Sequence, residues 1–355
     1  MNERAYLDVI SGRRRGVIAG VMRVGLALLT PFYRMAVITR YWLFDTGLKT
    51  THSVDVPVIS IGNITTGGTG KTPVVAWVTQ WLTSQGKQPG IVSRGYRSLD
   101  DAGNDELRVL EQLCPGVPHV QSHDRLMAAR KAIASHDVDV IVLDDGFQHR
   151  RLHRDLDIVL VDATNPWGYG HLLPRGLLRE PHSALCRADI IVLTRVDHVD
   201  EDSLKRVRQQ ASQLTVAPLA EVGFRPTGML SLSGKTVSLE ALMGENVFAF
   251  CGIGNPEGFR RTLSDAGIMV ADDAMVTFAD HHHYTEAEFV SLAEQAKSQR
   301  VTALVTTQKD LVKLDPSWET SLPVWALTIG AEIVAGREKW QSLLNDLLNK
   351  QRTSS

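Results

Sequence analysis

"VISIGNITTGGTGKTPVVAWVTQWL", residues 58–82, joins two different patterns through a glycine-rich turn. The β-branched apolar residues at its start predict a buried strand. Apolar residues then recur at helical spacing from Val74 to Leu82, and Pro73 suits the first turn of a helix. A strand, a glycine-rich turn and a helix in this order are typical of a phosphate-binding P-loop in an α/β protein.

The turn carries the chemistry of a nucleotide site. Lys71 can reach the β- and γ-phosphates, the Thr72 hydroxyl can ligate magnesium, and backbone N–H groups can hold phosphate. An ordinary βα turn would not explain the Lys-Thr pair. Thr65 replaces the first glycine of the pattern G-x-x-x-x-G-K-[ST], at a less essential corner of the loop. The predicted nucleotide-binding residues are Thr65, Thr66, Gly67, Gly68, Thr69, Gly70, Lys71 and Thr72.

The composition is that of a globular protein, with 43% hydrophobic and 22% charged residues. A chain of 355 residues can hold two domains, each with its own core. The three cysteines, Cys114, Cys186 and Cys251, are far apart and lack metal-ligand spacing. We therefore expect free thiols in a reducing compartment.

Residues 1–50 are both basic and strongly apolar. They contain eight Lys/Arg and three Asp/Glu, a net charge of +5, whereas the whole chain carries -2. Arg23 and Arg34 interrupt the apolar residues, so no uncharged run approaches the ~20 residues of a membrane span. Arg23 also argues against a signal peptide. Two alternatives remain: a buried core helix, or a basic amphipathic helix on an anionic membrane.

Beyond the P-loop helix, apolar runs alternate with helical patterns, which indicates a parallel sheet covered on both faces. Expected strands lie in residues 87–95, 138–146, 156–163 and 188–197, and expected helices in 124–136 and 201–214. Residues 216–235 are turn-rich and suit extended connecting strands. A second α/β set follows, with strands in 246–259, 300–310 and 322–330 and a helix in 337–350.

Asp144 and Asp145 end the apolar run 138–146. An acidic residue at the carboxyl end of a strand beside the P-loop is where such enzymes hold magnesium. An Asp-Gly pair also favours a turn. Because the paired aspartates lie downstream of a P-loop, metal binding is the better interpretation.

Three further stretches leave alternatives open. "TRVD", 194–197, matches the guanine-recognition motif of GTPases only weakly, so a strand-end turn is favoured. "FADHHHY", 278–284, has three consecutive histidines that cannot easily converge on one metal ion. A surface loop is favoured there over a histidine in proton transfer. "GYGHLLPRGLLREPHSAL", 168–185, contains arginines that could clamp phosphate or simply be solvated.

Together these stretches resemble the tetraacyldisaccharide 4'-kinase family. The matching segments, in the family's order from about residue 55 to 315, are "VPVISIGNITTGGTGKTP", "VSRGY", "DDGFQHRRL", "LLPRGLLREP", "FCGIGNPEGF", "FADHHHY" and "LVTTQKDLVKL". "DDGFQHRRL" and the P-loop variant ending in G-K-T-P are the specific ones. The resemblance implies a lipid kinase that uses ATP and Mg²⁺ to phosphorylate the 4'-hydroxyl of an acylated glucosamine disaccharide 1-phosphate, giving the lipid A precursor lipid IVA.

The resemblance also implies roles for single residues. Lys71 and Arg179 serve the ATP phosphates, and the catalytic pair is Asp105 with His281. Asp105 lies in "GNDEL", where the family has G-D-E-P; this chain has an inserted Asn104, and Leu107 in place of proline. The implied magnesium ligands are Thr72, Asp144, Asp145 and Glu180.

The implied architecture is a P-loop NTPase-like domain with a mostly parallel sheet, and a smaller second α/β domain joined to it by short extended linker strands. We expect basic apolar membrane-associating helices in residues 1–50, the P-loop kinase domain in 51–222, and the smaller domain, contributing to the active-site cleft, in 223–355.

An acylated substrate resides in a bilayer, so the resemblance favours the membrane-binding alternative for residues 1–50. It implies a peripheral or monotopic protein at the cytoplasmic face of the inner membrane, with Arg13, Arg14, Arg15 and Arg23 near anionic headgroups. Neither nucleic acid nor an obligate protein partner is expected. The rival hypothesis is a P-loop GTPase or ATPase switch without a phosphoryl acceptor, which has no evident use for Asp105 with His281.

Overall fold

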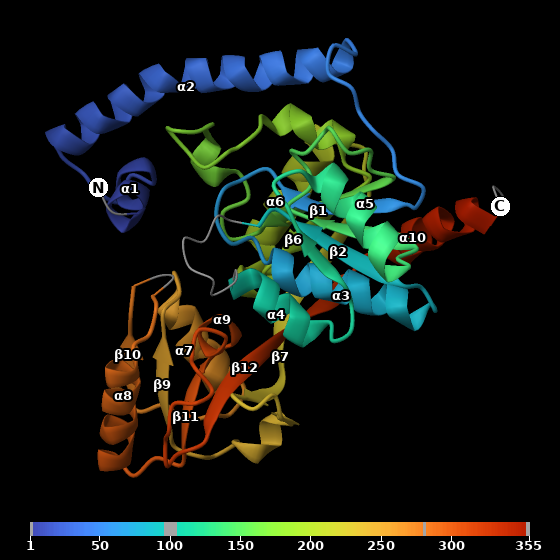
Figure 1. Cartoon of the computed structure of the whole chain (residues 1–355). Helices are drawn as coiled ribbons and strands as arrows, with labels where there is room; N and C mark the ends of the chain where they lie inside the picture. Colours follow the sequence, from blue (N-terminus) through green and yellow to red (C-terminus); the bar gives the residue numbers. More distant parts are fainter. Residues whose placement is uncertain (1–2, 96–104, 280–281, 353–355) are drawn as a thin grey trace. The chain divides into compact units, whose positions relative to one another are not determined.

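The computed structural model describes residues 3–95, 105–279 and 282–352 (Figure 1). It divides the chain into two compact units. Unit 1 consists of Met1–Gly95, Val117–Gly223 and Glu332–Ser355, and unit 2 of Tyr96–Gly116 and Phe224–Ala331. Each unit is therefore assembled from segments that are separate in the sequence.

Unit 1 is built on a parallel sheet with the strand order β7-β6-β5-β1-β4-β2-β3. Every residue of β1, β2, β4 and β6 is buried, as expected for strands covered on both faces. The strands are β1 (Val58–Asn63), β2 (Pro89–Ser93), β3 (His119–Gln121), β4 (Val140–Asp144), β5 (Leu156–Asp162), β6 (Ile190–Thr194) and β7 (Leu219–Ser231). The helices that follow them are α3 (Lys71–Ser84), α5 (Arg125–His136), α6 (Glu201–Leu214) and α10 (Arg337–Arg352). The expected α/β class with a mostly parallel sheet is confirmed.

The register of this sheet positions the glycine-rich turn. Ile61 of β1 pairs with Asp144, the last residue of β4. The two strands are parallel neighbours, so the turn after β1 and the acidic pair at the end of β4 lie at the same edge of the sheet.

Helix α10 completes the core of unit 1 from a distant part of the chain. Trp340 and Leu344 are fully buried, and the Trp340 ring lies 4.7 Å from the ring of Trp77 in α3. Large apolar side chains stabilise a core strongly when fully buried.

Unit 2 has the strand order β10-β9-β11-β12-β7, with the short strand β8 antiparallel to β7. Strand β9 is parallel to β10 and β11, and β11 is parallel to β12. Its elements are β8 (Thr236–Val237), β9 (Val247–Cys251), β10 (Met275–Thr277), β11 (Ala303–Thr307), β12 (Val324–Ala335), α4 (Asp105–Leu113), α7 (Pro256–Asp265), α8 (Glu286–Ser298) and α9 (Gln308–Leu311). In place of several short connecting strands, residues 219–231 form the single strand β7.

Helix α4 belongs to unit 2, although its sequence lies between β2 and β3 of unit 1. It contacts α9, and Arg108 donates a hydrogen bond from Nη1 to the carbonyl oxygen of Val312 at 2.7 Å. Val109 and Leu110 are buried. The chain therefore leaves unit 1 to place this one helix and then returns.

The N-terminal segment forms α1 (Glu3–Ile10) and the long helix α2 (Val17–Asp45). Ala19 is the one buried residue of α2. An apolar stripe at spacings of three or four residues is 50 to 84% exposed: Val17, Val21, Val24, Leu28, Phe32, Met35, Ile38 and Trp42. The alternative of a buried core helix is therefore wrong. By length and composition alone, α2 could also cross a membrane, despite Arg23 and Arg34.

Candidate functional site

The turn after β1 has the backbone that its glycines permit. Gly67 and Gly70 adopt φ angles of 101° and 81°, which disfavour residues with a side chain. Thr66 donates its N–H to the carbonyl oxygen of Leu177 at 2.8 Å, and Thr194 donates from its hydroxyl to the carbonyl oxygen of Thr69 at 2.9 Å. The turn is thus held on both sides in a fixed shape, as a phosphate-binding loop requires.

Lys71, the first residue of α3, lies at the carboxyl end of the sheet. Its Nζ is 3.6 Å from Oδ1 of Asp145 and 3.4 Å from Oδ1 of Asn63. These oxygens hold the ammonium group beside the loop, where a phosphate could take their place.

Asp145 also accepts a bidentate pair of hydrogen bonds from Arg179. Arg179 Nη1 lies 2.8 Å from Oδ1, and Nη2 lies 3.1 Å from Oδ2. Burial alone would raise the pKa of Asp145, but the charges of Lys71 and Arg179 outweigh it and hold this pKa below its ordinary value. The structure therefore brings Lys71, Asp145 and Arg179, all predicted site residues, into one cluster.

Asp144 and Thr72 supply hard oxygen atoms near this cluster. Asp144 ends β4 and is 7% exposed, and Thr72 lies in the first turn of α3. Among the described residues, no group of three or more His, Cys, Asp or Glu side chains could hold a metal ion alone. Magnesium commonly takes one or two carboxylates together with nucleotide phosphates, so Thr72, Asp144 and Asp145 fit this ion.

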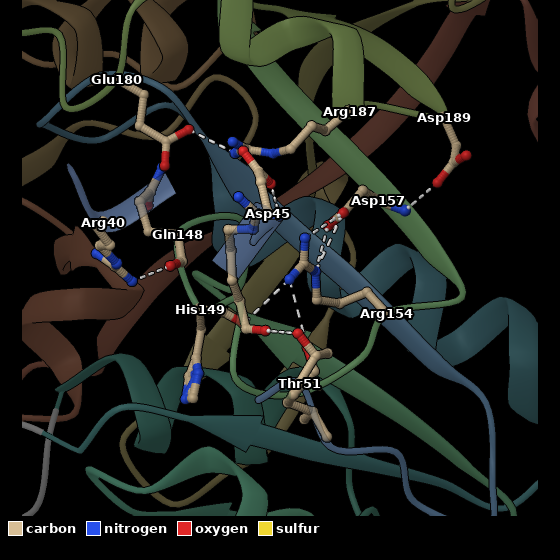
Figure 2. A network of polar contacts seen from close by, with 12 residues as sticks. Arg40, Asp45, Thr51, Gln148, His149, Arg154, Asp157, Glu180, Arg187 and Asp189 are labelled. Carbon is tan, nitrogen blue, oxygen red and sulfur yellow. Dashed lines mark hydrogen bonds and ion pairs between the residues drawn. The ribbon is translucent and has the colours of Figure 1, made fainter. Parts of the chain in front are cut away.

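Glu180 is engaged differently from its neighbour Arg179. Its carboxylate is 3% exposed and accepts a hydrogen bond from Nη2 of Arg187 at 2.7 Å (Figure 2). The Arg187 guanidinium lies over the rings of Tyr41 and Phe147, at 4.7 and 4.4 Å. This ion pair engages Oε2 of a carboxylate that the family resemblance implies as a magnesium ligand.

Three contacts of the site were missed by sequence reasoning. Gln148 donates from Nε2 to the carbonyl oxygen of Asn63 at 2.8 Å, and Arg40 of α2 donates to the carbonyl oxygen of Gln148 (Figure 2). Tyr33 of α2 donates its hydroxyl to the carbonyl oxygen of Arg179 at 3.0 Å. The inner face of α2 thus bonds to both loops that border the P-loop. The motif "DDGFQHRRL" draws attention to Gln148, but its sequence does not indicate which residue Gln148 contacts.

A pocket of about 210 Å³ lies between α2 and the loop that follows β5. Apolar and basic side chains share its wall, which consists of Ala27, Thr30, Pro31, Arg34, His171 and Arg175. Arg175 also donates to the carbonyl oxygen of Ile10 at 3.0 Å, so it holds α1.

Asp105 begins α4 in unit 2. Its carboxylate lies 3.7 Å from Nζ of Lys313, which is 3.2 Å from Oδ1 of the fully buried Asp310. Asp310 in turn accepts hydrogen bonds from the Gly252 N–H at 3.0 Å and the Thr307 hydroxyl at 2.7 Å. His281, the other predicted catalytic residue, lies outside the described residues.

Residues of two further motifs make local contacts. His282 stacks on Phe278 with ring centroids 4.5 Å apart and contacts Glu288 at 3.2 Å. Residues 196–198, in "TRVD", form a 3-10 turn directly after β6, and Arg195 pairs with Asp162.

Comparison with known proteins identifies the family. The model of the tetraacyldisaccharide-1-P 4'-kinase family, LpxK, matches residues 22–349. The chain belongs to this family.

Tetraacyldisaccharide 4'-kinases of known sequence resemble the chain over most of its length. The protein from Syntrophus aciditrophicus is 38% identical over 330 residues, covering 86% of this chain and 87% of that protein. The one from Anaeromyxobacter sp. strain Fw109-5 is 37% identical over 344 residues, covering 92% of each. The crystal structure of LpxK from Aquifex aeolicus in complex with ATP matches with a TM-score of 0.74 and 30% identity, covering 92% of this chain and 99% of that one. The family resemblance in the sequence motifs is confirmed.

Proposed function

We propose that the chain is an ATP-dependent kinase that phosphorylates the 4'-hydroxyl of tetraacyldisaccharide 1-phosphate, giving lipid IVA. The observation that carries the proposal is the cluster of Lys71, Asp145 and Arg179 at the P-loop of a chain that belongs to the tetraacyldisaccharide 4'-kinase family. The rival, a regulatory switch without an acceptor, finds no support in this family.

The phosphates of ATP would contact the loop Thr65–Gly70 through its backbone N–H groups. Lys71 and Arg179 would leave Asp145 and bind the phosphate oxygens, where charge develops as the phosphoryl group is transferred. Because both cations already lie beside the loop, this exchange needs only local movement.

Thr72, Asp144 and Asp145 would hold Mg²⁺, which neutralises charge on the phosphates. Glu180, the fourth implied ligand, pairs with Arg187 through Oε2 and would also fix the loop that carries Arg179. The low pKa of Asp145 keeps it ionised, as a metal ligand must be.

Asp105 would accept the proton of the 4'-hydroxyl, and His281 would orient and tune the carboxylate. A sugar hydroxyl is a poor nucleophile at neutral pH, so a positioned base helps as the phosphoryl group arrives. The contact with Lys313 supports this role, because it fixes one face of the Asp105 carboxylate.

The enzyme would act at the cytoplasmic face of the inner membrane. The exposed apolar stripe of α2 and the exposed Arg13, Arg14 and Arg15 match an interfacial helix that meets anionic headgroups. The pocket beside α2 combines apolar lining with Arg34 and Arg175, which suits an acylated and phosphorylated sugar.

The test is incubation of the full chain with Mg-ATP and detergent-dispersed tetraacyldisaccharide 1-phosphate, followed by mass spectrometry. One added phosphate at the 4'-position is expected. The matched control, Lys71→Ala, should lose turnover while its thermal unfolding temperature stays close to that of the wild type. Nucleotide hydrolysis with strong GTP selectivity and no phosphorylated lipid would favour the switch.

A further inference from the structure

Arg125 has no role in the proposed site so far, although it lies at the same edge of the sheet. It is the first residue of α5, which packs on β2 and β3. Asp124 caps this helix by accepting the N–H groups of Leu126 and Met127. The helix thus begins at the carboxyl ends of the strands, with Arg125 in its first turn.

Within the described part of the chain, no carboxylate forms an ion pair with the buried guanidinium of Arg125. The residue is 8% exposed, its Nη1 donates to the carbonyl oxygen of His123 at 3.2 Å, and its buried Nε–H has no acceptor among the described residues. Arg154 is the contrasting case in the same unit: its side chain is 9% exposed, and it forms a bidentate pair with Asp157, at 3.2 and 2.8 Å (Figure 2). A buried charge that lacks such a partner is costly. Arg125 can therefore still donate hydrogen bonds to a bound anion.

The charged groups around Arg125 also favour the binding of an anion. Its electrostatic neighbours are Arg94, Asp145, Asp144 and Arg179, and Lys71 acts on the same Asp145. Burial, and then the charge of Arg94, lower the pKa of Arg125. Among the described residues, Asp145 already pairs with Lys71 and Arg179, and Glu180 pairs with Arg187, so neither carboxylate is left to pair with Arg125.

The strand order indicates which phosphate Arg125 would meet. In the sheet, β4 lies between β1, which carries the P-loop, and β2, on which α5 packs. Arg125 therefore approaches the acidic pair of β4 from the side opposite the P-loop. The phosphoryl group that reaches farthest from the loop is the terminal one.

We infer that Arg125 binds the terminal phosphoryl group of ATP, in the ground state and during its transfer. This inference rests on the proposed function and adds a phosphate-binding residue to the same site. A guanidinium suits this task, because it presents several donors in one plane to phosphate oxygens.

The test compares Arg125→Met and Arg125→Lys with Arg130→Met, which removes an exposed arginine from the same helix. Calorimetry without lipid gives the Kd values of ATP and ADP, and a kinase assay gives kcat. Arg125→Met should raise the Kd of ATP about 10-fold or more, leave the Kd of ADP within about twofold, and lower kcat by ~10² or more. Arg125→Lys should recover part of the loss, and Arg130→Met should resemble the wild type.

Thermal unfolding separates binding from a structural role. The Arg125→Met variant should unfold at the same or a higher temperature than the wild type, because it removes a buried charge that forms no ion pair with a described carboxylate. A lower unfolding temperature with normal kcat would make Arg125 structural and overturn the inference. Equal losses of ATP and ADP affinity would place Arg125 on other phosphates. A raised KM for the lipid alone would assign it to the lipid's phosphate. The calorimetric arm uses no acceptor, so it can succeed or fail separately from the lipid kinase assay.

Discussion

Asp105 is the residue at which the proposed chemistry can be tested most directly. Asp105→Asn should lower kcat by ~10² or more, because the amide cannot accept the proton of the 4'-hydroxyl. The Kd of ATP should change little, since Asp105 has no assigned contact with the nucleotide. Glu106→Gln, one position along α4, is the matched control, and its carboxylate lies 3.9 Å from Lys309.

The partner residue extends this test. His281→Ala should also lower kcat, and the variant that combines it with Asp105→Asn should lose much less than the product of the two single losses, because the pair acts as a unit. Fully multiplicative losses would show that the two residues act independently.

A half-buried histidine in unit 1, His119, makes stability depend on pH. Burial lowers the pKa of His119 from 6.5 to about 4, and its Nε2 lies 2.8 Å from the Ser93 hydroxyl. Below pH 6.5 the imidazole of His119 is protonated in the unfolded chain but stays neutral in the folded chain until the pH nears 4. The contribution of neutral His119 to the free energy of unfolding is therefore complete above pH 6.5 and is lost as the pH falls toward 4. His119→Gln, which can retain a donor near Ser93, should flatten the fall of unfolding temperature between pH 7 and pH 5. The exposed His136→Gln serves as the control. An unchanged slope in His119→Gln would contradict the assignment.

Sequence patterns predict some residues of the site well and others poorly. Lys71 could be located because it follows the glycine-rich turn after β1, and Asp144 and Asp145 because they lie at the end of the apolar strand β4. Parallel strands bring their carboxyl ends to one edge. Arg125 could not, because an arginine in "DRLMAAR" is usually solvated, and its burial depends on packing against β2 and β3. The ion pair of Glu180 with Arg187 could not be predicted either, because it depends on the local loop structure and not on the strand pattern.

At the scale of elements, α2 presents two different faces. Tyr33 and Arg40 bond to the loops beside the P-loop, whereas the apolar stripe is exposed. Helical periodicity predicted an amphipathic helix, but it could not show which polar residues bond to unit 1. A helix with these faces can join a membrane surface to the nucleotide site.

The exposed stripe leads to a prediction on membrane binding. Leu28→Asp should weaken sedimentation with anionic vesicles, because it places a charge in the apolar face that enters the interface. Val216→Asp, a change at a fully exposed position outside α2, is the control. Removal of residues 1 to about 30 should weaken binding further, and high salt should weaken binding of the intact chain. Sedimentation that is indifferent to all three changes would show that α2 does not bind the membrane.

At the scale of the whole molecule, unit 1 depends on a helix that follows unit 2 in the sequence. Trp340→Ala in α10 should lower the free energy of unfolding by ~3–5 kcal/mol, because it removes a fully buried ring that packs on Trp77. Trp340→Phe should lose clearly less, since most of the ring contact remains. Urea unfolding, followed with a probe at the nucleotide site, measures the free energy of unfolding of both variants. Equal losses in the two variants would show that the contact with Trp77 is not what stabilises α10.

The general course of the fold was predictable from alternating apolar and helical runs, whereas the assignment of α4 to unit 2 was not. Its sequence is an ordinary amphipathic pattern, and nothing local shows that Val109 and Leu110 are buried in unit 2, where α4 contacts α9. Contacts between segments separated by more than a hundred residues arise from tertiary packing, which single-sequence periodicity does not report.

The passage of the chain between the units sets an order of events during protein synthesis. Helix α4 leaves the ribosome more than a hundred residues before the strands of unit 2 that follow residue 224, so it must wait for the surface on which it packs. Unit 1 waits as well, because α10 is translated only after all of unit 2. Unit 1 therefore cannot be completed before unit 2 has been made, and a product that ends near residue 300 lacks part of both units. We expect such nascent chains to need chaperones for longer than those of a protein whose domains follow one another in sequence.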